Sequence, residues 1–160
     1  MDLPHNVKIG VYNQARLENL WEKVRQFPTT FADGTRDIES FVNRILAPNS
    51  VVLELDGGII LIENIVPGLK AEFHATFWDR KLSARTDTLQ HIVLWAFFTF
   101  RLERLETYVA SFARAVRRFL TQRLGFVYEG TKRNAYQNRG VLYNLDIFSI
   151  LREEVFNGPR

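Results

Sequence analysis

The sequence contains few side chains of the types that carry out chemistry. Cysteine is absent, which excludes disulfides, thiolate metal sites and a thiol nucleophile. The three histidines, His5, His74 and His91, have neither a metal-binding spacing nor cysteine partners, so we predict no metal site. No G-x-S-x-G serine elbow and no glycine-rich phosphate loop occurs.

Two residues close in the sequence, Glu72 and His74, could serve as a general base, directly or through a water molecule. Both lie in residues 71–78, which we predict to form a strand. The alternative for His74 is a residue packed in the sheet without a chemical role.

The basic residues are mostly arginine, sixteen of the 21, although the net charge is only +3. Arginine favours bidentate pairing with carboxylate and phosphate groups. One cluster follows residues 71–78, and a second lies on a predicted helix over residues 112–124. Each cluster either binds an anion or forms a solvated surface. The second cluster lacks interleaved aromatic residues, which argues against nucleic acid as a partner. The clusters comprise Arg80, Lys81 and Arg85, and then Arg114, Arg117, Arg118 and Arg123.

Residues 71–100 read as a strand, a polar loop and a long apolar helix, and they organise the rest of the chain. The Thr86 hydroxyl and the Asp87 carboxylate suit a helix N-terminus. Apolar residues then recur at spacings of three and four up to Phe100. A helix N-terminus behind a strand is a natural anion site, because its N–H groups and dipole point outward.

The flanking segments complete an alternating pattern of strands and helices. We predict strands at residues 7–12, 51–55, 59–66, 105–110, 126–136 and 141–151. Helices are predicted after Asn13, over residues 38–46, and over residues 86–100 and 112–124. The order predicts an α+β (mixed α/β) fold, and without a linker or repeat we expect one domain over residues 1–160. No apolar run is long enough to span a membrane and no signal peptide is evident, so we expect a cytoplasmic protein.

One segment, Arg123-Leu124-Gly125-Phe126-Val127-Tyr128-Glu129-Gly130-Thr131-Lys132-Arg133, is similar to the "lGF-x-x-EG-x-x-R" segment of the GNAT superfamily of N-acetyltransferases. Upstream, Trp95-Ala96-Phe97 and then Arg104-Leu105 stand at the spacing of that family's "yaF…R-l/i" helix and strand. The order of elements matches over most of the chain. Within the superfamily, the chain most resembles the branch that acts on ribosomal-protein N-termini and similar amines.

The resemblance implies a mostly antiparallel central sheet with two splayed parallel strands and helices on both faces. It implies direct transfer of an acyl group from acetyl-CoA to a primary amine of a small molecule, protein or peptide, by a monomer or homodimer. The pantetheine arm of CoA would lie along Ala75, Thr76 and Phe77 of the first splayed strand. The CoA pyrophosphate would lie on the loop ahead of the central helix, formed by Arg80, Lys81, Leu82, Ser83, Ala84, Arg85 and Thr86.

Several positions depart from the family pattern. Ser83 and Arg85 replace the Gly and the Gly or Ala of the pyrophosphate loop, where glycine lets a phosphate approach the backbone closely. Arg114 and Arg117 occupy the positions of an Asn and a Ser or Ala near CoA, and we include both among the candidate CoA ligands. Thr121 takes the place of the Tyr that protonates the leaving thiolate, so it is the candidate general acid. The alternative to an active enzyme is a GNAT-fold binding or structural module whose pyrophosphate loop is eroded.

Overall fold

The computed structural model describes residues 1–27, 37–78, 86–138 and 140–157. Seven strands form one mixed sheet in the order β1-β2-β3-β4-β5-β7-β6. Their bounds are β1 Val7–Ile9, β2 Val51–Leu55, β3 Gly58–Val66, β4 Lys70–Phe77, β5 Arg104–Ala110, β6 Val127–Asn138 and β7 Val141–Leu151. Among these described strands, only β4 and β5 pair in parallel, because the helix between them carries the chain back across the sheet. The predicted mixed fold is therefore confirmed.

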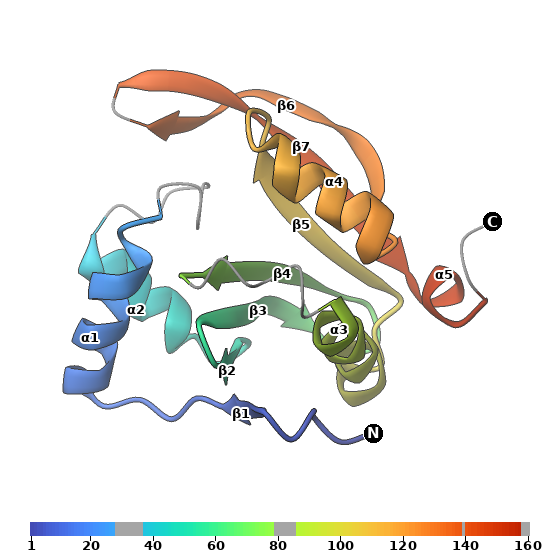
Figure 1. Ribbon diagram of the computed structural model, residues 1–160, viewed down its shortest axis with the longest axis horizontal. Coiled ribbons are helices and arrows are strands. Elements are labelled where there is room, and N and C mark those ends of the chain that lie inside the picture. The colour runs from blue at the N-terminus through green and yellow to red at the C-terminus, as the bar shows by residue number, and fades with distance from the viewer. Residues whose placement is uncertain (28–36, 79–85, 139, 158–160) are drawn as a thin grey trace.

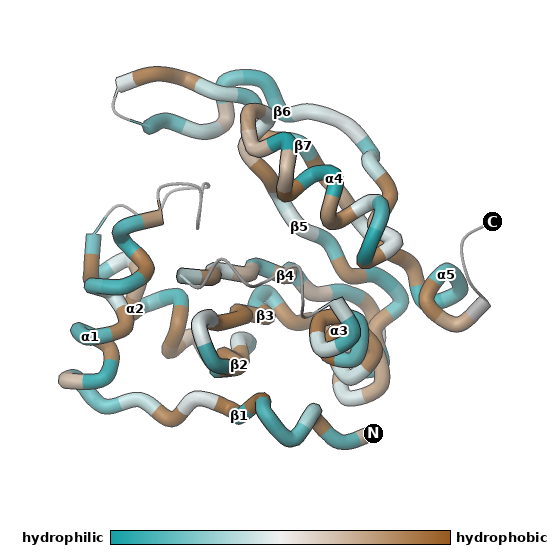
Figure 2. Tube along the Cα trace, in the orientation of Figure 1, coloured by the Kyte–Doolittle hydropathy of each residue, from teal (hydrophilic) through white to brown (hydrophobic). Residues whose placement is uncertain are grey.

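Helices cover both faces of the sheet (Figure 1). Their bounds are α1 Gln14–Val24, α2 Ile38–Ile45, α3 Thr86–Phe100, α4 Arg114–Arg123 and α5 Arg152–Asn157. One face packs on α3 and α4 around Phe73, Phe97 and Phe148. The other face packs on α1 and α2 around Phe41, Leu61 and their neighbours. Figure 2 shows α1 and α4 alternating between apolar and polar residues along their length, as expected for helices with one buried side.

The parallel strands β4 and β5 separate soon after they begin. Their register contains three pairs, Lys70 with Arg104, Ala71 with Leu105, and Glu72 with Glu106. Beyond these pairs each strand continues for several residues, and β4 remains paired only to β3 while β5 remains paired only to β7. We call this open region, beyond Glu72 and Glu106, the fork. The sequence-based expectation of two splayed parallel strands is correct.

The segment that resembles the GNAT family has a structural role in this fold. Glu129 on β6 forms a bidentate ion pair with the guanidinium of Arg104 on β5, and Ser149 Oγ donates to Glu129 at 2.7 Å. Arg104 Nε also donates to Glu106 at 3.0 Å. A bulge follows at Gly130, whose φ of 155° lies in a region that side chains disfavour. These contacts bind β6 and β7 to the start of β5, and we call them the hinge network.

The C-terminal helix α5 was not predicted from the sequence. Arg152 at its start donates from Nε to the carbonyl of Leu102 at 2.8 Å and from a second nitrogen to that of Phe97 at 3.2 Å. Arg152 thereby supplies a positive charge at the end of α3, which has no basic residue in its own last turn. No helix in the described ranges is long and apolar enough to cross a membrane.

Candidate active site

The fork encloses a cavity of about 90 Å³. Its lining comes from β4, β5 and α4: Phe73, His74, Ala75, Thr107, Tyr108, Val109, Ala110, Ala113, Val116 and Leu120. Within the described ranges, neither strand has a neighbouring strand on the side that faces the cavity, so the backbone N–H and C=O groups of that edge are available to a ligand. A ligand with amide groups could therefore bind along either strand.

Two small or apolar side chains beside the cavity are exposed, although they lie in elements that otherwise contribute to the core. Ala75 is exposed on β4, and Val116 on α4 is 46% exposed. An amphipathic helix over residues 112–124 would turn the apolar Phe112 and Val116 inward, yet both side chains are exposed. Val116 lies over the gap between the strands rather than over a continuous sheet, and Phe112 precedes α4 and contacts the ring of Tyr143 instead.

A buried cluster of charged residues lies beside the fork on the sheet face that carries α1 and α2. His74 Nε2 lies 3.0 Å from a carboxylate oxygen of Glu63 on β3 and 3.5 Å from one of Glu72 on β4. Arg44 on α2 donates from Nε to the other Glu63 oxygen at 2.9 Å and forms a second, closer contact. Asn64 donates from its amide to Glu72 at 3.0 Å. The structure therefore brings the predicted Glu72 and His74 together.

The charges in this cluster control one another's protonation. Burial alone would lower the pKa of His74, but Glu63 and Glu72 outweigh burial and raise it above its usual 6.5. Burial alone would raise the pKa of Glu63, yet Arg44 and His74 lower it from 4.5 to about 2. The potential ligand atoms of Glu63, Glu72 and His74 lie within 4.8 Å of one another. Since Arg44 already occupies both oxygens of Glu63, we interpret the group as an ion-pair cluster rather than a metal site.

The next residue on this face of β4, Thr76, is only 3% exposed, and its hydroxyl has no hydrogen-bond partner among the described residues. A buried hydroxyl without a partner costs free energy, roughly 1–3 kcal/mol. Ala75 and Thr76, both predicted to lie along CoA, thus belong to the open part of β4. Phe77, the third such residue, packs against the core beside α3.

The remaining predicted CoA ligands are in different surroundings. Thr86 begins α3, as expected. Arg114 is exposed at the start of α4, next to Ala113 of the cavity lining. Arg117 pairs through Nε with the buried carboxylate of Asp146 at 3.0 Å, so its guanidinium is already engaged within the protein. The loop residues predicted to hold the pyrophosphate lie outside the described residues: Arg80, Lys81, Leu82, Ser83, Ala84 and Arg85.

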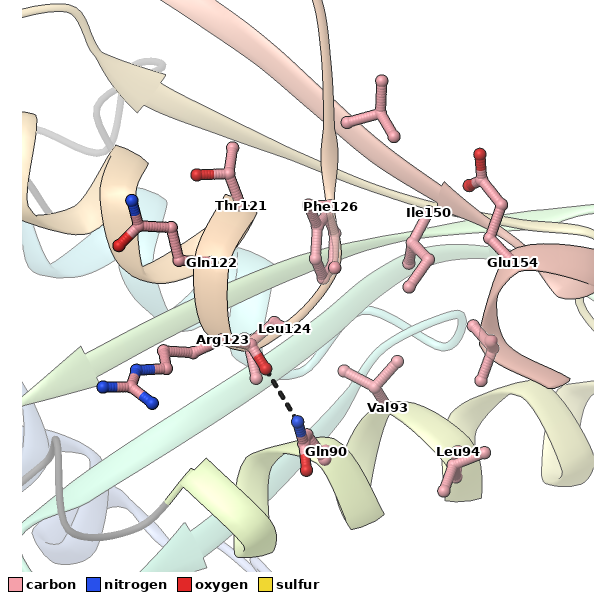
Figure 3. Close-up of a pocket in the computed structure, with 13 residues that line it drawn as sticks. Gln90, Val93, Leu94, Thr121, Gln122, Arg123, Leu124, Phe126, Ile150 and Glu154 are labelled. Carbon is pink, nitrogen blue, oxygen red and sulfur yellow. Dashed lines mark hydrogen bonds between the residues drawn. The ribbon is translucent and has the colours of Figure 1, made fainter. Parts of the chain in front are cut away.

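Thr121, the predicted general acid, does not line the fork cavity. Its hydroxyl lies within hydrogen-bonding distance of the Arg117 and Arg118 carbonyls in the preceding turn, at 3.1 and 3.2 Å. It borders a separate, larger pocket of about 610 Å³ between α3, α4 and α5 (Figure 3). There Gln90 donates to the carbonyl of Arg123 at 2.7 Å.

Three residues of the site were missed by the sequence analysis: Arg44, Glu63 and Tyr108. Glu63 is the first charge after the apolar run Ile59-Ile60-Leu61-Ile62, and a charge next to a buried run is a signal that could have been used. Arg44 approaches only through the packing of α2, which no local pattern shows. Tyr108 lies on β5 two residues beyond Glu106, as His74 lies two beyond Glu72 on β4, so the two residues occupy matching positions on the two sides of the fork.

The seven-stranded sheet, the single parallel pair that separates and the helices on both faces define the fold of the GNAT acetyltransferases. A structure described as a probable acetyltransferase matches with a TM-score of 0.71 and 19% identity, covering 96% of this chain and 97% of that chain. Spermidine N-acetyltransferase from Vibrio cholerae, in complex with CoA and spermine, matches with a TM-score of 0.73 and 15% identity, covering 96% and 100%. A putative acetyltransferase matches with a TM-score of 0.70 and 20% identity, covering 94% and 86%.

Comparison of sequences alone identifies no relatives, since no protein-family model and no curated protein matches the chain. At 15–20% identity the structural similarity establishes the fold. The activity has to be argued from the site.

Proposed function

We propose that the protein is an N-acetyltransferase that moves an acetyl group directly from acetyl-CoA to a primary amine. The observation that carries this proposal is the fork, where β4 and β5 stop pairing after Glu72 and Glu106 and leave a lined cavity. Similarity to an acetyltransferase whose structure contains CoA supports the same conclusion.

The fork fits the pantetheine arm of CoA, which is a narrow chain with two amide groups. The unpaired edges of β4 and β5 offer strand-like hydrogen bonds to those amides, with Ala75 and Thr76 on one side and Thr107 to Ala110 on the other. The exposed side chains of Ala75 and Val116 supply apolar surface that such a chain would cover. Bound here, acetyl-CoA supplies an activated thioester.

The residues beside the fork can accept the proton that the amine gives up. An acceptor amine must be neutral to attack, and a terminal α-amine, with a pKa of roughly 8, needs less help than a lysine near 10.4. His74 lines the cavity and Glu72 lies 3.5 Å from it, so a proton acceptor is available beside the cavity. A small-molecule amine is one acceptor class, since one structural neighbour is a spermidine N-acetyltransferase. A peptide N-terminus is the other, because the sequence resembles the ribosomal-protein branch.

Calorimetric titration with CoA and acetyl-CoA tests the first half of the proposal, and release of free thiol in the presence of amines tests the second. The amine panel should contain spermidine, a lysine derivative and short peptides with free N-termini. We expect micromolar binding of acetyl-CoA and thiol release that depends on one acceptor class. Absence of binding at millimolar CoA would instead favour a GNAT-fold binding module.

A further inference from the structure

The sheet face that carries Glu72 is covered unevenly. Helices α1 and α2 pack on its β2 and β3 part. On the β5, β7 and β6 part, Glu106 pairs with Glu72 in register, and Ala110, four residues further along β5, points to the same face. Register then aligns Ala110 with Leu145 and Leu145 with Lys132, so Lys132 on β6 belongs to this face as well. Here the face carries a small cluster that, among the described residues, contains no helix residue: Ala110, Tyr136, Leu145 and Tyr143.

An aromatic contact holds Lys132 beside the fork. Its Nζ lies 4.4 Å from the centroid of the Tyr108 ring, and Tyr108 lines the cavity. The negative face of the ring attracts the ammonium and so places it, but does not neutralise its charge. Lys132 is exposed, and no carboxylate in the described ranges forms an ion pair with it. Its positive charge is therefore available to a ligand at the cavity.

The carboxylates on this face, in contrast, are already bound within the protein. Within the described parts of β3 to β6, the pairs are Glu63 with Arg44, Glu106 with Arg104 and Lys70, Glu129 with Arg104, and Glu72 with Asn64 and His74. Four carboxylates thus stand against four cations, because Lys132 joins the two arginines on this face and Lys70. A binding site for a polyamine needs an excess of negative charge, and this face has none.

We propose that the acceptor is a primary amine that also carries a carboxylate or another anionic group, and that Lys132 binds this anionic group while the amine enters the fork. This inference rests on the proposed acetyltransferase function and narrows its acceptor. Complementary charge favours such a molecule and disfavours a polycation. A free amino acid and a peptide N-terminus followed by an acidic side chain share this chemistry, whereas spermidine lacks it.

Lys132 takes no part in the transfer itself. The amine nitrogen forms a bond to the acetyl carbon and loses one proton. The C–S bond breaks with its electron pair on sulfur, and the sulfur gains one proton to become the free thiol. The role of Lys132 is therefore confined to the choice of acceptor, and its substitution should change kcat/KM differently for acceptors of different charge.

Peptides that differ in one charge test the preference. Three short peptides with free N-termini carry glutamate, glutamine or lysine as the second residue, and thiol release measures kcat/KM. We expect the glutamate peptide to exceed the glutamine peptide about fivefold, the size of an exposed ion pair, and the lysine peptide to be poorest. Added salt should reduce the difference. Free glutamate and β-alanine in the same assay distinguish a free amino acid from a peptide as the source of the amine. Equal or faster acetylation of the lysine peptide or spermidine would overturn the proposal.

Reversal of the charge at Lys132 should reverse the preference. In Lys132→Glu the glutamate peptide should become a poorer acceptor than the glutamine peptide, and spermidine should improve. Lys132→Arg should keep the wild-type order. Lys8→Glu is the matched control, since Lys8 is exposed on β1, at the opposite edge of the sheet, and the change in net charge is the same. If Lys132→Glu does not fold, as judged by circular dichroism, Lys132→Gln should still abolish the preference.

The two possible failures can be told apart. A wild-type protein that transfers no acetyl group to any amine refutes the proposed function and this inference with it. An active wild type whose order of acceptors is the same in Lys132→Glu refutes only the role of Lys132.

Discussion

The fork and the hinge network both contain buried carboxylates paired with arginine, yet the two regions differ in what surrounds them. In the hinge network, Arg104 joins Glu106 and Glu129 across three paired strands, β5, β7 and β6. At the fork, the cluster around His74 borders a cavity and strand edges without a neighbour. Similar ion pairs therefore secure the fold in one region and can take part in chemistry in the other.

This comparison explains why the family resemblance identified the fold but not the residues of the candidate site. Its motif residues Arg104, Glu129 and Gly130 belong to the hinge network, whereas His74 lines the fork and Glu63 lies beside it. The motif identified the fold correctly because it holds β5, β7 and β6 together. It carried no information about the residues proposed to transfer the proton, which depend on other contacts.

The largest expected difference between the two regions is in activity, when the proposed general base is substituted. His74→Asn and Glu72→Gln should each lower kcat/KM by ~10²-fold or more at neutral pH, the usual range for a general base. Thiol release under saturating acetyl-CoA measures the effect. Glu129→Gln in the hinge network is the control and should change the rate only a few-fold. Full activity in both fork variants would return Glu72 and His74 to a purely structural role.

Filling the fork should weaken CoA binding strongly without unfolding the protein. Ala75→Trp places a large ring at an exposed position beside the cavity, so we expect CoA affinity to fall about 100-fold, equivalent to about 2.7 kcal/mol. Calorimetry gives the affinity, and circular dichroism reports the fold. Ala135→Trp, at an exposed position of β6, is the matched control. Equal CoA affinity in the two variants would argue against binding in the fork.

The hinge network should show the opposite behaviour, with an effect on stability and none on ligand affinity. Arg104→Met leaves Glu106 buried, with Lys70 at 3.2 Å as its only remaining charged partner among the residues that the structure describes. We expect the free energy of unfolding in urea to fall by roughly 1–3 kcal/mol. A double-mutant cycle with Glu129→Gln should give a coupling energy of at least about 0.5 kcal/mol. A tenfold loss of CoA affinity in folded Arg104→Met would contradict this division of roles.

The smallest expected effect concerns Arg85, in the loop outside the described residues. If this loop binds the CoA pyrophosphate despite Ser83, Arg85→Ala should weaken CoA about tenfold, since a charge-assisted hydrogen bond contributes roughly 1.5–3 kcal/mol. Added salt should then reduce the affinity of the wild type. Tighter binding by Arg85→Ala would show that Arg85 occupies the phosphate position itself. Arg25→Ala, on α1's C-terminal cap, serves as the control.

Local patterns predicted most of the fold. The strands over residues 51–55 and 59–66, which form a hairpin, and the helix beginning at Thr86 were located correctly because each depends on neighbours in the sequence. The helix α5 was missed because it has only six residues, and its contacts to α3 are made through Arg152 across the fold.

The site was harder to predict because its properties arise from packing. Glu72 and His74 were visible as possible bases, but the pKa of His74 depends on Glu63 through strand register and on Arg44 through the position of α2. Arg117 is a case in which packing changed the role that the sequence predicted. The sequence makes it a candidate phosphate ligand, but in the structure it pairs with Asp146, 29 residues further along the chain. Residue type indicated what each side chain could bind, and tertiary structure determined what it does bind.

The short register between β4 and β5 has a mechanical consequence. Between these strands the sheet is joined by three residue pairs, whereas β5 and β7 are joined by seven. A ligand bonded along both open edges would extend that short joint and act as an additional strand. Ligand binding should therefore slow hydrogen exchange of the backbone amides in β4 and β5. It should also couple the unfolding of the two halves of the sheet, β1 to β4 and β5 to β6, more tightly.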